Sequence, residues 1–318
     1  MQSILVTGAT GFVGAAFCAE MKKRGIGFVP AVRSRASPGD FQLGQLDGGT
    51  DWTPALRKCD TVMHLAARVH RMDDAGPDAI GAYREGNVNL TLNLARQAAE
   101  SGVRRFVFVS SVKVNGELSG CRPFSATDVP APQDPYGLSK WEAEQALREL
   151  GAASGMEIVI VRPPLVYGPG VRANFLRLMQ LVRSGVPIPL ASVKNRRSLV
   201  GLRNLVDFLL VCVLHPRAAG KVWMVSDQHD VTIAELIRLI AAAMEKPARL
   251  LPVPPGLLAG AASVLGKRAA AMRLLDPLQV DSTPATELLG WRPPLSLEEG
   301  IRDAVSHFLA YSAHEKTL

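Results

Sequence analysis

The sequence predicts an α/β fold in which helices cover both faces of a doubly wound parallel sheet, with a smaller C-terminal domain. Three observations carry this prediction: short apolar stretches recur, segments with helical periodicity separate most of them, and a glycine-rich turn follows the first stretch. Strands that are apolar at nearly every position need cover on both faces, as in parallel sheets. A chain of 318 residues with 47% hydrophobic content can bury such a core.

Six stretches have the length and composition of buried strands. In chain order they are ILVT (4–7), GFVPAV (27–32), DTVMHLAA (60–67), RFVFVSS (105–111), EIVIVRP (157–163) and KVWMVSD (221–227). Helical periodicity is clear in FVGAAFCAEMKKRG and NVNLTLNLARQAAESG, which lie between strands.

The pattern loosens after about residue 168, where prolines and glycines cluster, and a last helix is predicted in WRPPLSLEEGIRDAVSHFLAY. We therefore expect a first, dinucleotide-binding domain over 1–168 and a second, mainly substrate-binding domain over 169–318. The apolar strand near 221–227 indicates that about 198–227 returns to the first sheet.

Composition narrows the classes of protein. The net charge of +7 is spread along the chain without an aromatic-rich binding motif, which argues against a nucleic-acid partner and fits a phosphate-bearing ligand. The longest apolar runs, at 205–214 and 250–266, fall short of the ~20 residues of a membrane span. The four cysteines are too far apart for a zinc site or a disulfide framework. The chain enters its first strand without a signal-peptide pattern, so we expect a cytoplasmic protein. The short apolar runs and the widely spaced cysteines predict neither membrane insertion nor a bound metal.

The first strand runs into TGATGFVG at 7–14. Gly8 permits a tight turn, Gly11 lets the backbone approach a pyrophosphate, and Gly14 lets the following helix pack closely. The spacing is one residue longer at the first gap than G-x-G-x-x-G. Because a strand precedes it and a helix follows, the turn predicts dinucleotide binding.

The end of the second strand bears on the choice of dinucleotide. The text there is AVRSRAS, in which Arg33 and Arg35 stand where an acidic residue would select NAD, and no acid occurs until Asp40. An arginine at this point favours the 2′-phosphate of NADP. NADP is therefore favoured. NAD stays open, because the simpler explanation for both arginines is that they are ordinary solvent-exposed residues.

Tyr136 and Lys140 lie four residues apart in DPYGLSKWEAEQAL, so they share one face of the predicted helix. An ammonium beside a phenol stabilises the phenolate and lowers its pKa from about 10. The pair therefore predicts proton exchange with an alcohol or ketone oxygen.

The motifs TGATGFVG, HLAA, YGLSK and RPPLVYGPG, with the serine pair of VSSVKVNG, together resemble the extended short-chain dehydrogenase/reductase family, in particular its nucleotide-sugar branch. The similarity extends over nearly the whole chain. It implies a Rossmann-type first domain, a smaller α/β substrate domain, a UDP-sugar substrate and a homodimer.

The resemblance also implies roles for individual residues. Tyr136 matches the catalytic tyrosine, Lys140 the lysine that binds the nicotinamide ribose, and Ser111 the serine that orients the substrate. The residues expected to contact the dinucleotide are Gly8, Thr10, Gly11, Phe12, Val13, Gly14, Arg33, Leu46, Leu65, Ala66, Ala67, Asn87, Val109, Tyr136, Lys140 and Pro163. Those expected to contact the substrate are Ser110, Ser111, Lys113, Asn174, Arg197 and Arg273. Gln45 stands where relatives often carry an acidic residue.

The residues after the serine pair limit the reaction. Sugar 4,6-dehydratases resemble S-T/S-D-E here, because elimination needs an acid and a base, whereas this chain has Val112 and Lys113. Redox chemistry at one carbon, C4, is then expected. The stretches RRSLVGLRNLVD, VRANFLRLM and SSVKVNGE resemble bacterial reductases of surface-polysaccharide pathways. This resemblance implies a 4-ketoreductase acting on UDP-2-acetamido-2,6-dideoxy-hexos-4-ulose in O-antigen and lipopolysaccharide synthesis. A UDP-hexose or UDP-N-acetylhexosamine 4-epimerase is the first alternative, and a catalytically silent NAD(P)-binding sensor is the second.

Overall fold

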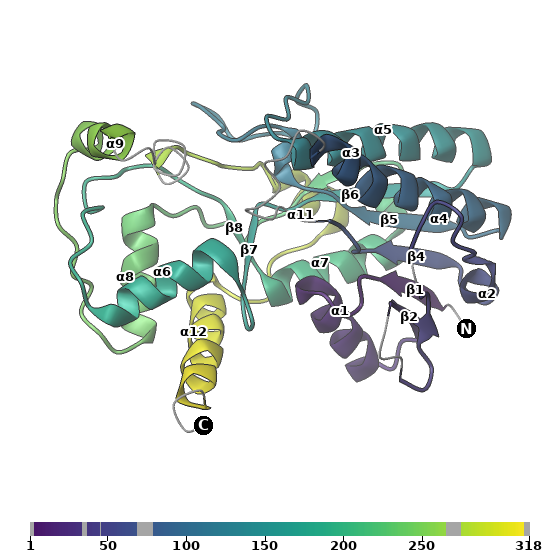
Figure 1. The fold of residues 1–318 in the computed structure, drawn as a ribbon, viewed down its shortest axis with the longest axis horizontal. Helices are drawn as coiled ribbons and strands as arrows, with labels where there is room; N and C mark the ends of the chain where they lie inside the picture. The colour runs from purple at the N-terminus through teal and green to yellow at the C-terminus, as the bar shows by residue number, and fades with distance from the viewer. Residues whose placement is uncertain (1–2, 34–36, 45, 69–78, 265–274, 315–318) are drawn as a thin grey trace.

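A computed structural model describes residues 3–33, 37–44, 46–68, 79–264 and 275–314. Seven strands in this part of the chain form one sheet in which all neighbours run parallel, with helices on both faces (Figure 1). The predicted fold class is therefore confirmed. In sheet order the strands are β3 (Phe41–Gln42), β2 (Phe28–Val32), β1 (Ile4–Thr7), β4 (Thr61–His64), β5 (Arg105–Val109), β6 (Glu157–Arg162) and β9 (Val222–Met224).

The order of the strands reverses at β1, which pairs with β2 on one side and β4 on the other. Thr7 lies beside His64 in this register, and His64 lies beside Phe108. The carboxyl ends of β1, β4 and β5 therefore meet at one edge. Open α/β sheets bind ligands at such a reversal point.

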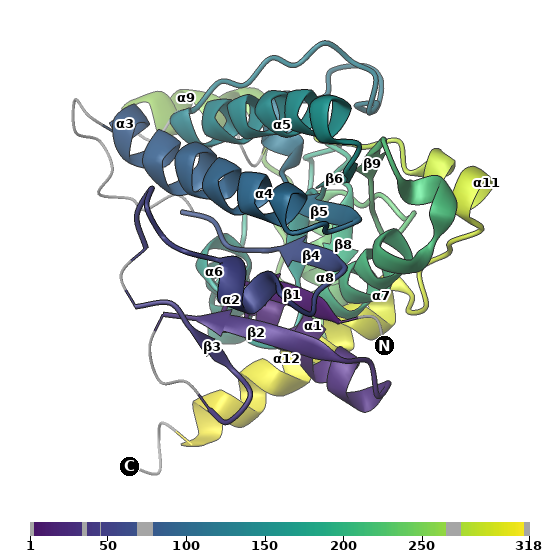
Figure 2. The same cartoon turned by 90° about the vertical axis from the view of Figure 1, so that its right-hand side faces the viewer.

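Alternate residues of the strands face two different helical layers. Val6, Met63 and Val107 pack with one layer, which contains α1 and α7, whereas Leu5 and Phe106 pack with the other, which contains α4 and α5 (Figure 2). The helical segments of this domain are α1 (Phe12–Lys23), α2 (Thr53–Leu56), α3 (Ala79–Arg84), the π-helical turn η1 (Glu85–Asn89), α4 (Leu90–Glu100), the 3₁₀ turn η2 (Val112–Val114), α5 (Pro135–Ser154), α7 (Leu202–Leu214), the 3₁₀ turn η3 (Pro216–Ala218) and α11 (Thr283–Leu289).

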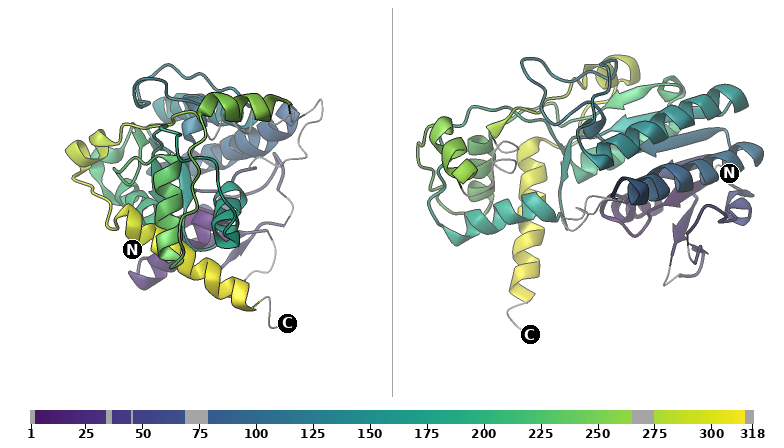
Figure 3. Two further views of the ribbon diagram at one scale, coloured as in Figure 1. Left: turned by 90° about the vertical axis from the view of Figure 1, so that its left-hand side faces the viewer. Right: turned by 45° about the horizontal axis from the view of Figure 1, so that its top comes forward.

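A second group of elements lies beside the sheet (Figure 3). It consists of β7 (Leu165–Tyr167), α6 (Ala173–Ser184), β8 (Leu199–Gly201), α8 (Ile233–Ala243), α9 (Pro255–Val264) and α12 (Leu297–His314). Strands β7 and β8 form a separate parallel pair, and α6, α8 and α12 share a core with them. Within 198–227, β8 thus belongs to this group, while α7 and β9 pack with the large sheet.

No helix among the described residues combines the length and the apolar character needed to cross a membrane.

Candidate functional site

The turn between β1 and α1 depends on two glycines. Gly8 has a φ of +67°, and a Cβ there would lie 2.6 Å from the backbone nitrogen of Ala66. A Cβ at Gly14 would lie 2.0 Å from the carbonyl oxygen of Gly8. Gly8 therefore permits a left-handed turn and the close approach of the segment after β4, and Gly14 lets α1 pack against the turn.

Helix α1 begins with backbone donors that can bind an anion. Gly11 is its N-cap, and within the described chain no side chain caps it and its first turn has no acidic residue. The first N–H groups of a helix have no partner inside the helix, and its dipole favours negative charge. Thr10 and Gly11 are exposed at this point, and Phe12 and Val13 are partly buried. The turn therefore fits the pyrophosphate of a dinucleotide.

Helix α5 places Tyr136 in its first turn and Lys140 one turn later. Asp134 is the N-cap, and its Oδ1 accepts a hydrogen bond from the backbone nitrogen of Gly137 at 2.6 Å. Pro135 occupies the first helical position, where its missing N–H costs nothing. Capping residue and proline together fix where the helix begins, and so where Tyr136 lies.

Ser111 follows β5 and meets this helix. It is the N-cap of η2, and its hydroxyl accepts a hydrogen bond from the backbone nitrogen of Lys113 at 3.2 Å. The side chain of Ser111 also forms a hydrogen bond with the phenol of Tyr136. The structure thus brings together two of the three residues that the sequence assigns to catalysis, 25 positions apart in the chain.

The pKa of Tyr136 lies above its ordinary value of 10, because burial disfavours the phenolate and the negative charge of Asp134 adds to this effect. The hydrogen bond from Ser111 acts in the opposite direction. The prediction that the phenol has a lowered pKa is therefore wrong for this structure. The ammonium of Lys140 binds the carbonyl of Val109 instead.

Lys140 is the third of these residues and is almost completely buried, with 2% of its surface exposed. Its Nζ donates a hydrogen bond to the carbonyl of Val109 at 2.8 Å and lies 4.3 Å from the centroid of the Phe108 ring. Burial lowers the pKa of Lys140 to about 7, although the charge of Glu144 opposes this. The side chain therefore exchanges its proton near neutral pH.

We expect Lys140→Met to raise the free energy of unfolding by roughly 1–3 kcal/mol at pH 6.5, because methionine carries no charge to bury. The unfolded lysine has a pKa of about 10.4, and the folded one about 7. The wild type consequently loses stability as pH falls through this window, and the variant does not. Urea unfolding at pH 6.5 and at pH 10 measures the difference. An equal difference at both pH values would contradict the prediction.

A buried histidine that the sequence analysis did not assign lies beneath the site. His64 is hydrogen-bonded through Nδ1 to Thr7 Oγ1 and through Nε2 to Thr91 Oγ1, both at 2.9 Å. Thr91 donates its own proton to the carbonyl of Asn87, so His64 Nε2 carries the hydrogen and Nδ1 accepts one from Thr7. Burial lowers the pKa of His64 to about 3, so the ring stays neutral. His64 belongs to the HLAA motif, but the sequence around it does not indicate that Thr7 and Thr91 are its hydrogen-bond partners.

Asn87 links the segment after β4 to α5. Its Nδ2 donates to the carbonyl of Arg68 at 3.1 Å and to Ser139 Oγ at 3.0 Å, and its Oδ1 accepts from the backbone nitrogen of Arg68 at 2.8 Å. Asn87 is buried within η1 and does not cap a helix. Its role toward a dinucleotide remains a prediction; in the structure it braces the wall of the site.

Ser110 points away from Ser111 and into a buried polar network. Its Oγ donates to Glu144 Oε1 at 2.5 Å, and Arg162 binds the same carboxylate at 2.9 and 2.5 Å. Arg162 also donates to Asn115 Oδ1 at 2.9 Å. Since the hydroxyl proton of Ser110 is already donated to Glu144, this geometry gives no support to the predicted substrate contact.

The other predicted substrate residues lie in different surroundings. Lys113 forms ion pairs with Glu117 and Asp134. Arg197 is half-buried and donates to the carbonyl of Asp276 at 2.9 Å. Asn174 is exposed in the first turn of α6, and Arg273 lies outside the described residues.

The remaining predicted dinucleotide residues surround the same sheet edge. Leu65, Ala66 and Ala67 follow β4 and are partly buried, and the carbonyl of Pro163 accepts a hydrogen bond from Val112 N at 3.0 Å. Arg33 is exposed just after β2, and Leu46 packs against the core. Arg35 and Gln45 fall outside the described residues.

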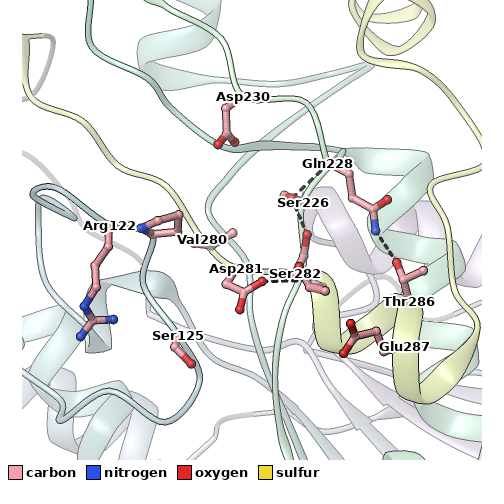
Figure 4. A pocket seen from close by; sticks show the side chains of 12 residues that line it. Arg122, Ser125, Ser226, Gln228, Asp230, Val280, Asp281, Ser282, Thr286 and Glu287 are labelled. Atoms are coloured by element: carbon pink, nitrogen blue, oxygen red, sulfur yellow. Dashed lines mark hydrogen bonds between the residues drawn. The ribbon is translucent and has the colours of Figure 1, made fainter.

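A cavity of about 650 Å³ lies elsewhere, beyond the end of β9 (Figure 4). The loop with Arg122 and Ser125 forms one side, and the buried hydroxyls of Ser226 and Ser282, 2.8 Å apart, lie in its wall. Among the predicted site residues that the structure describes, none lines this cavity, Tyr136 included. We therefore place the candidate active site at the sheet edge near Tyr136.

The chain is similar to known proteins over nearly its whole length. Residues 4–226 match the model of the NAD-dependent epimerase/dehydratase family. A Vibrio cholerae UDP-glucose 4-epimerase is 46% identical over 97% of this chain and 96% of its own. The N-acetyl-alpha-D-glucosaminyl-diphospho-ditrans,octacis-undecaprenol 4-epimerase of Escherichia coli O157:H7 is 29% identical, covering 94% and 93%. The fold resembles UDP-glucuronic acid 4-epimerase from Bacillus cereus in complex with NAD, with a TM-score of 0.79, 22% identity and coverage of 98% and 99%.

Proposed function

The chain belongs to the NAD-dependent epimerase/dehydratase family, and on this premise we propose that it is a UDP-hexose 4-epimerase. The 46% identity to UDP-glucose 4-epimerase over nearly the full length of both chains is the observation that supports this most. We therefore rank 4-epimerase activity above the 4-ketoreductase activity that the sequence motifs favour. Both reactions act on the same carbon.

The residues at the sheet edge suit reversible oxidation at C4. A bound nicotinamide dinucleotide supplies the acceptor and donor of hydride, and its pyrophosphate would lie on the glycine turn and the first turn of α1. As the phenolate, Tyr136 takes the proton of the C4 hydroxyl while the C4 hydride would pass to the dinucleotide, and it returns the proton to the same oxygen when the hydride comes back to the other face of the ketone. Ser111, hydrogen-bonded to Tyr136, orients that oxygen. No net redox change results, so no external reductant is consumed.

The 4-ketoreductase remains the second candidate because of Arg33. This residue is exposed just after β2, where an arginine accommodates the 2′-phosphate of NADP. A freely exchanging NADPH is the reductant that a reductase needs. The homodimer, the cytoplasmic location and the role in surface-polysaccharide synthesis remain predictions.

A single preparation distinguishes the two reactions. The protein is purified without added dinucleotide, denatured, and its supernatant analysed for NAD(H) and NADP(H). A second portion is incubated with UDP-glucose and with UDP-N-acetylglucosamine, and inversion at C4 is followed by proton NMR. We expect retained NAD(H) and inversion without added dinucleotide.

The reductase has a different signature. Incubation with a UDP-4-keto-6-deoxy-N-acetylhexosamine and NADPH would then consume one NADPH for each sugar reduced, and no UDP-hexose would be inverted. That result would overturn the epimerase proposal in favour of the second candidate.

A further inference from the structure

The N-cap of α5 places a negative charge beside the catalytic tyrosine. Asp134 uses Oδ1 to cap the helix through Gly137 N at 2.6 Å. Its carboxylate lies two residues before Tyr136, and its charge opposes ionisation of the phenol. The same carboxylate that starts the helix thus works against the phenolate that the reaction needs.

Lys113 lies against this carboxylate. Its Nζ forms an ion pair with Asp134 Oδ2 and a second one with Glu117 Oε1 at 2.8 Å. All three side chains are partly exposed, at 31% for Lys113, 19% for Asp134 and 22% for Glu117. The ammonium therefore offsets the charge of Asp134, the carboxylate that acts on the phenol.

The backbone of Lys113 also connects the two catalytic segments. Its N–H donates to Ser111 Oγ at 3.2 Å, and this hydrogen bond holds the serine hydroxyl in place. A Cβ at Gly137 would lie 2.7 Å from the carbonyl oxygen of Lys113, so η2 and the start of α5 are in direct contact. The ion pair across this contact joins the turn that holds Ser111 to the helix that holds Tyr136.

Other groups around the phenol are few in the described chain. Tyr83 on α3 has its ring centroid 6.2 Å from that of Tyr136, and the Arg68 guanidinium lies 5.7 Å from the Tyr83 ring centroid. Lys140 follows one turn along α5 and donates to Val109. Asp134 is the nearest acidic residue in sequence, and Lys113 is a cation bound to it.

We propose that Lys113 is a positioning residue for the reaction, neutralising Asp134 beside Tyr136 and fastening the Ser111 turn to helix α5. This rests on the proposed role of Tyr136 as proton acceptor. Lys113 acts through Asp134 and takes no proton from the substrate itself. The sequence alone places Lys113 only among residues facing the sugar.

The test compares pH profiles of kcat/KM for the wild type, Lys113→Met, Lys113→Arg, Asp134→Asn and the double variant Lys113→Met/Asp134→Asn. We expect the midpoint of the acid limb to rise by about 0.5–1 pH unit in Lys113→Met, which lowers kcat/KM about 3–10-fold below the midpoint, because the pair is partly solvated. Lys113→Arg should restore the wild-type midpoint. In the Asp134→Asn background, Lys113→Met should cause no further shift.

A matched control removes a cation that contacts the same helix. Arg84 pairs with Glu142 on α5 at 2.6 Å, and Arg84→Met should leave the midpoint unchanged. The proposal is overturned if the acid-limb midpoint of Lys113→Met lies within 0.2 pH unit of the wild-type midpoint. It is also overturned if Lys113→Met shifts the midpoint equally in the Asp134→Asn background.

Tyrosinate absorbance near 295 nm gives a readout that needs no turnover. Subtracting the titration curve of the Tyr136→Phe counterpart from that of each protein gives the ionisation of the Tyr136 phenol. The midpoint should again rise in Lys113→Met. If no UDP-sugar is inverted but this shift occurs, the proposed function fails and the inference about Lys113 stands.

Discussion

Replacing Tyr136 with phenylalanine is expected to lower kcat for C4 inversion by about 10²–10⁴-fold, the usual contribution of a positioned acid–base group. The variant keeps the ring but lacks the oxygen that exchanges the proton, and with it the hydrogen bond to Ser111. Helix α5 begins from Asp134 and Pro135, neither of which is altered. We therefore expect folding and retained dinucleotide to match the wild type.

The measurements are the initial rate of UDP-hexose inversion, the dinucleotide content and the thermal unfolding midpoint. Tyr83→Phe is the matched control, because Tyr83 is buried and packs edge-on against Tyr136. It should retain turnover within about tenfold of the wild type. A Tyr136→Phe protein with more than a tenth of wild-type turnover would remove the phenol from the mechanism.

The second large effect is expected in stability. Arg162→Met should lower the free energy of unfolding by about 3–5 kcal/mol, because it leaves a buried carboxylate without its cation. Arg162 is 1% exposed and Glu144 0%, with a shortest contact of 2.5 Å. The remaining partner of that carboxylate among these contacts, Ser110, donates only a neutral hydrogen bond.

Urea unfolding at pH 7 tests this prediction. The double variant Glu144→Leu/Arg162→Met should recover most of the loss, since replacing both members of a buried pair with apolar residues is often neutral. Arg203→Met is the matched control: Arg203 pairs with Asp303 at 2.9 Å but is 65% exposed, so the cost should stay below about 1 kcal/mol. If Arg162→Met lowers the free energy of unfolding by less than 1 kcal/mol, the buried ion pair contributes little to stability and the prediction is wrong.

Local pattern was sufficient for much of the fold. Strands built from apolar residues at nearly every position need two covered faces, and this periodicity alone predicts the parallel sheet. The glycines at 8 and 14 meet backbone atoms that leave no room for a Cβ, so their function can be read from type and spacing. The four-residue interval between Tyr136 and Lys140 likewise predicts a shared helix face, because that interval is close to one helical turn.

Contacts between distant segments required the tertiary structure. Adjacent serines look equivalent in VSSVKVNG, yet Ser111 meets Tyr136 whereas Ser110 meets Glu144. Lys113 looks like a residue facing the sugar, and its partner Asp134 lies 21 positions away. No periodicity carries this information, because it depends on how β5, η2 and α5 pack.

The direction of the Tyr136 pKa shift also depends on contacts that only the tertiary structure shows. Sequence spacing places an ammonium one turn from the phenol and predicts a lowered pKa, whereas burial and the charge of Asp134 raise it. Lys140 instead donates to Val109. The sequence by itself determined the glycine turn after β1 and the shared helix face of Tyr136 and Lys140, since residue type and spacing are local properties. Only the tertiary structure decided their partners and charge states, because desolvation and Coulomb interactions depend on three-dimensional distance.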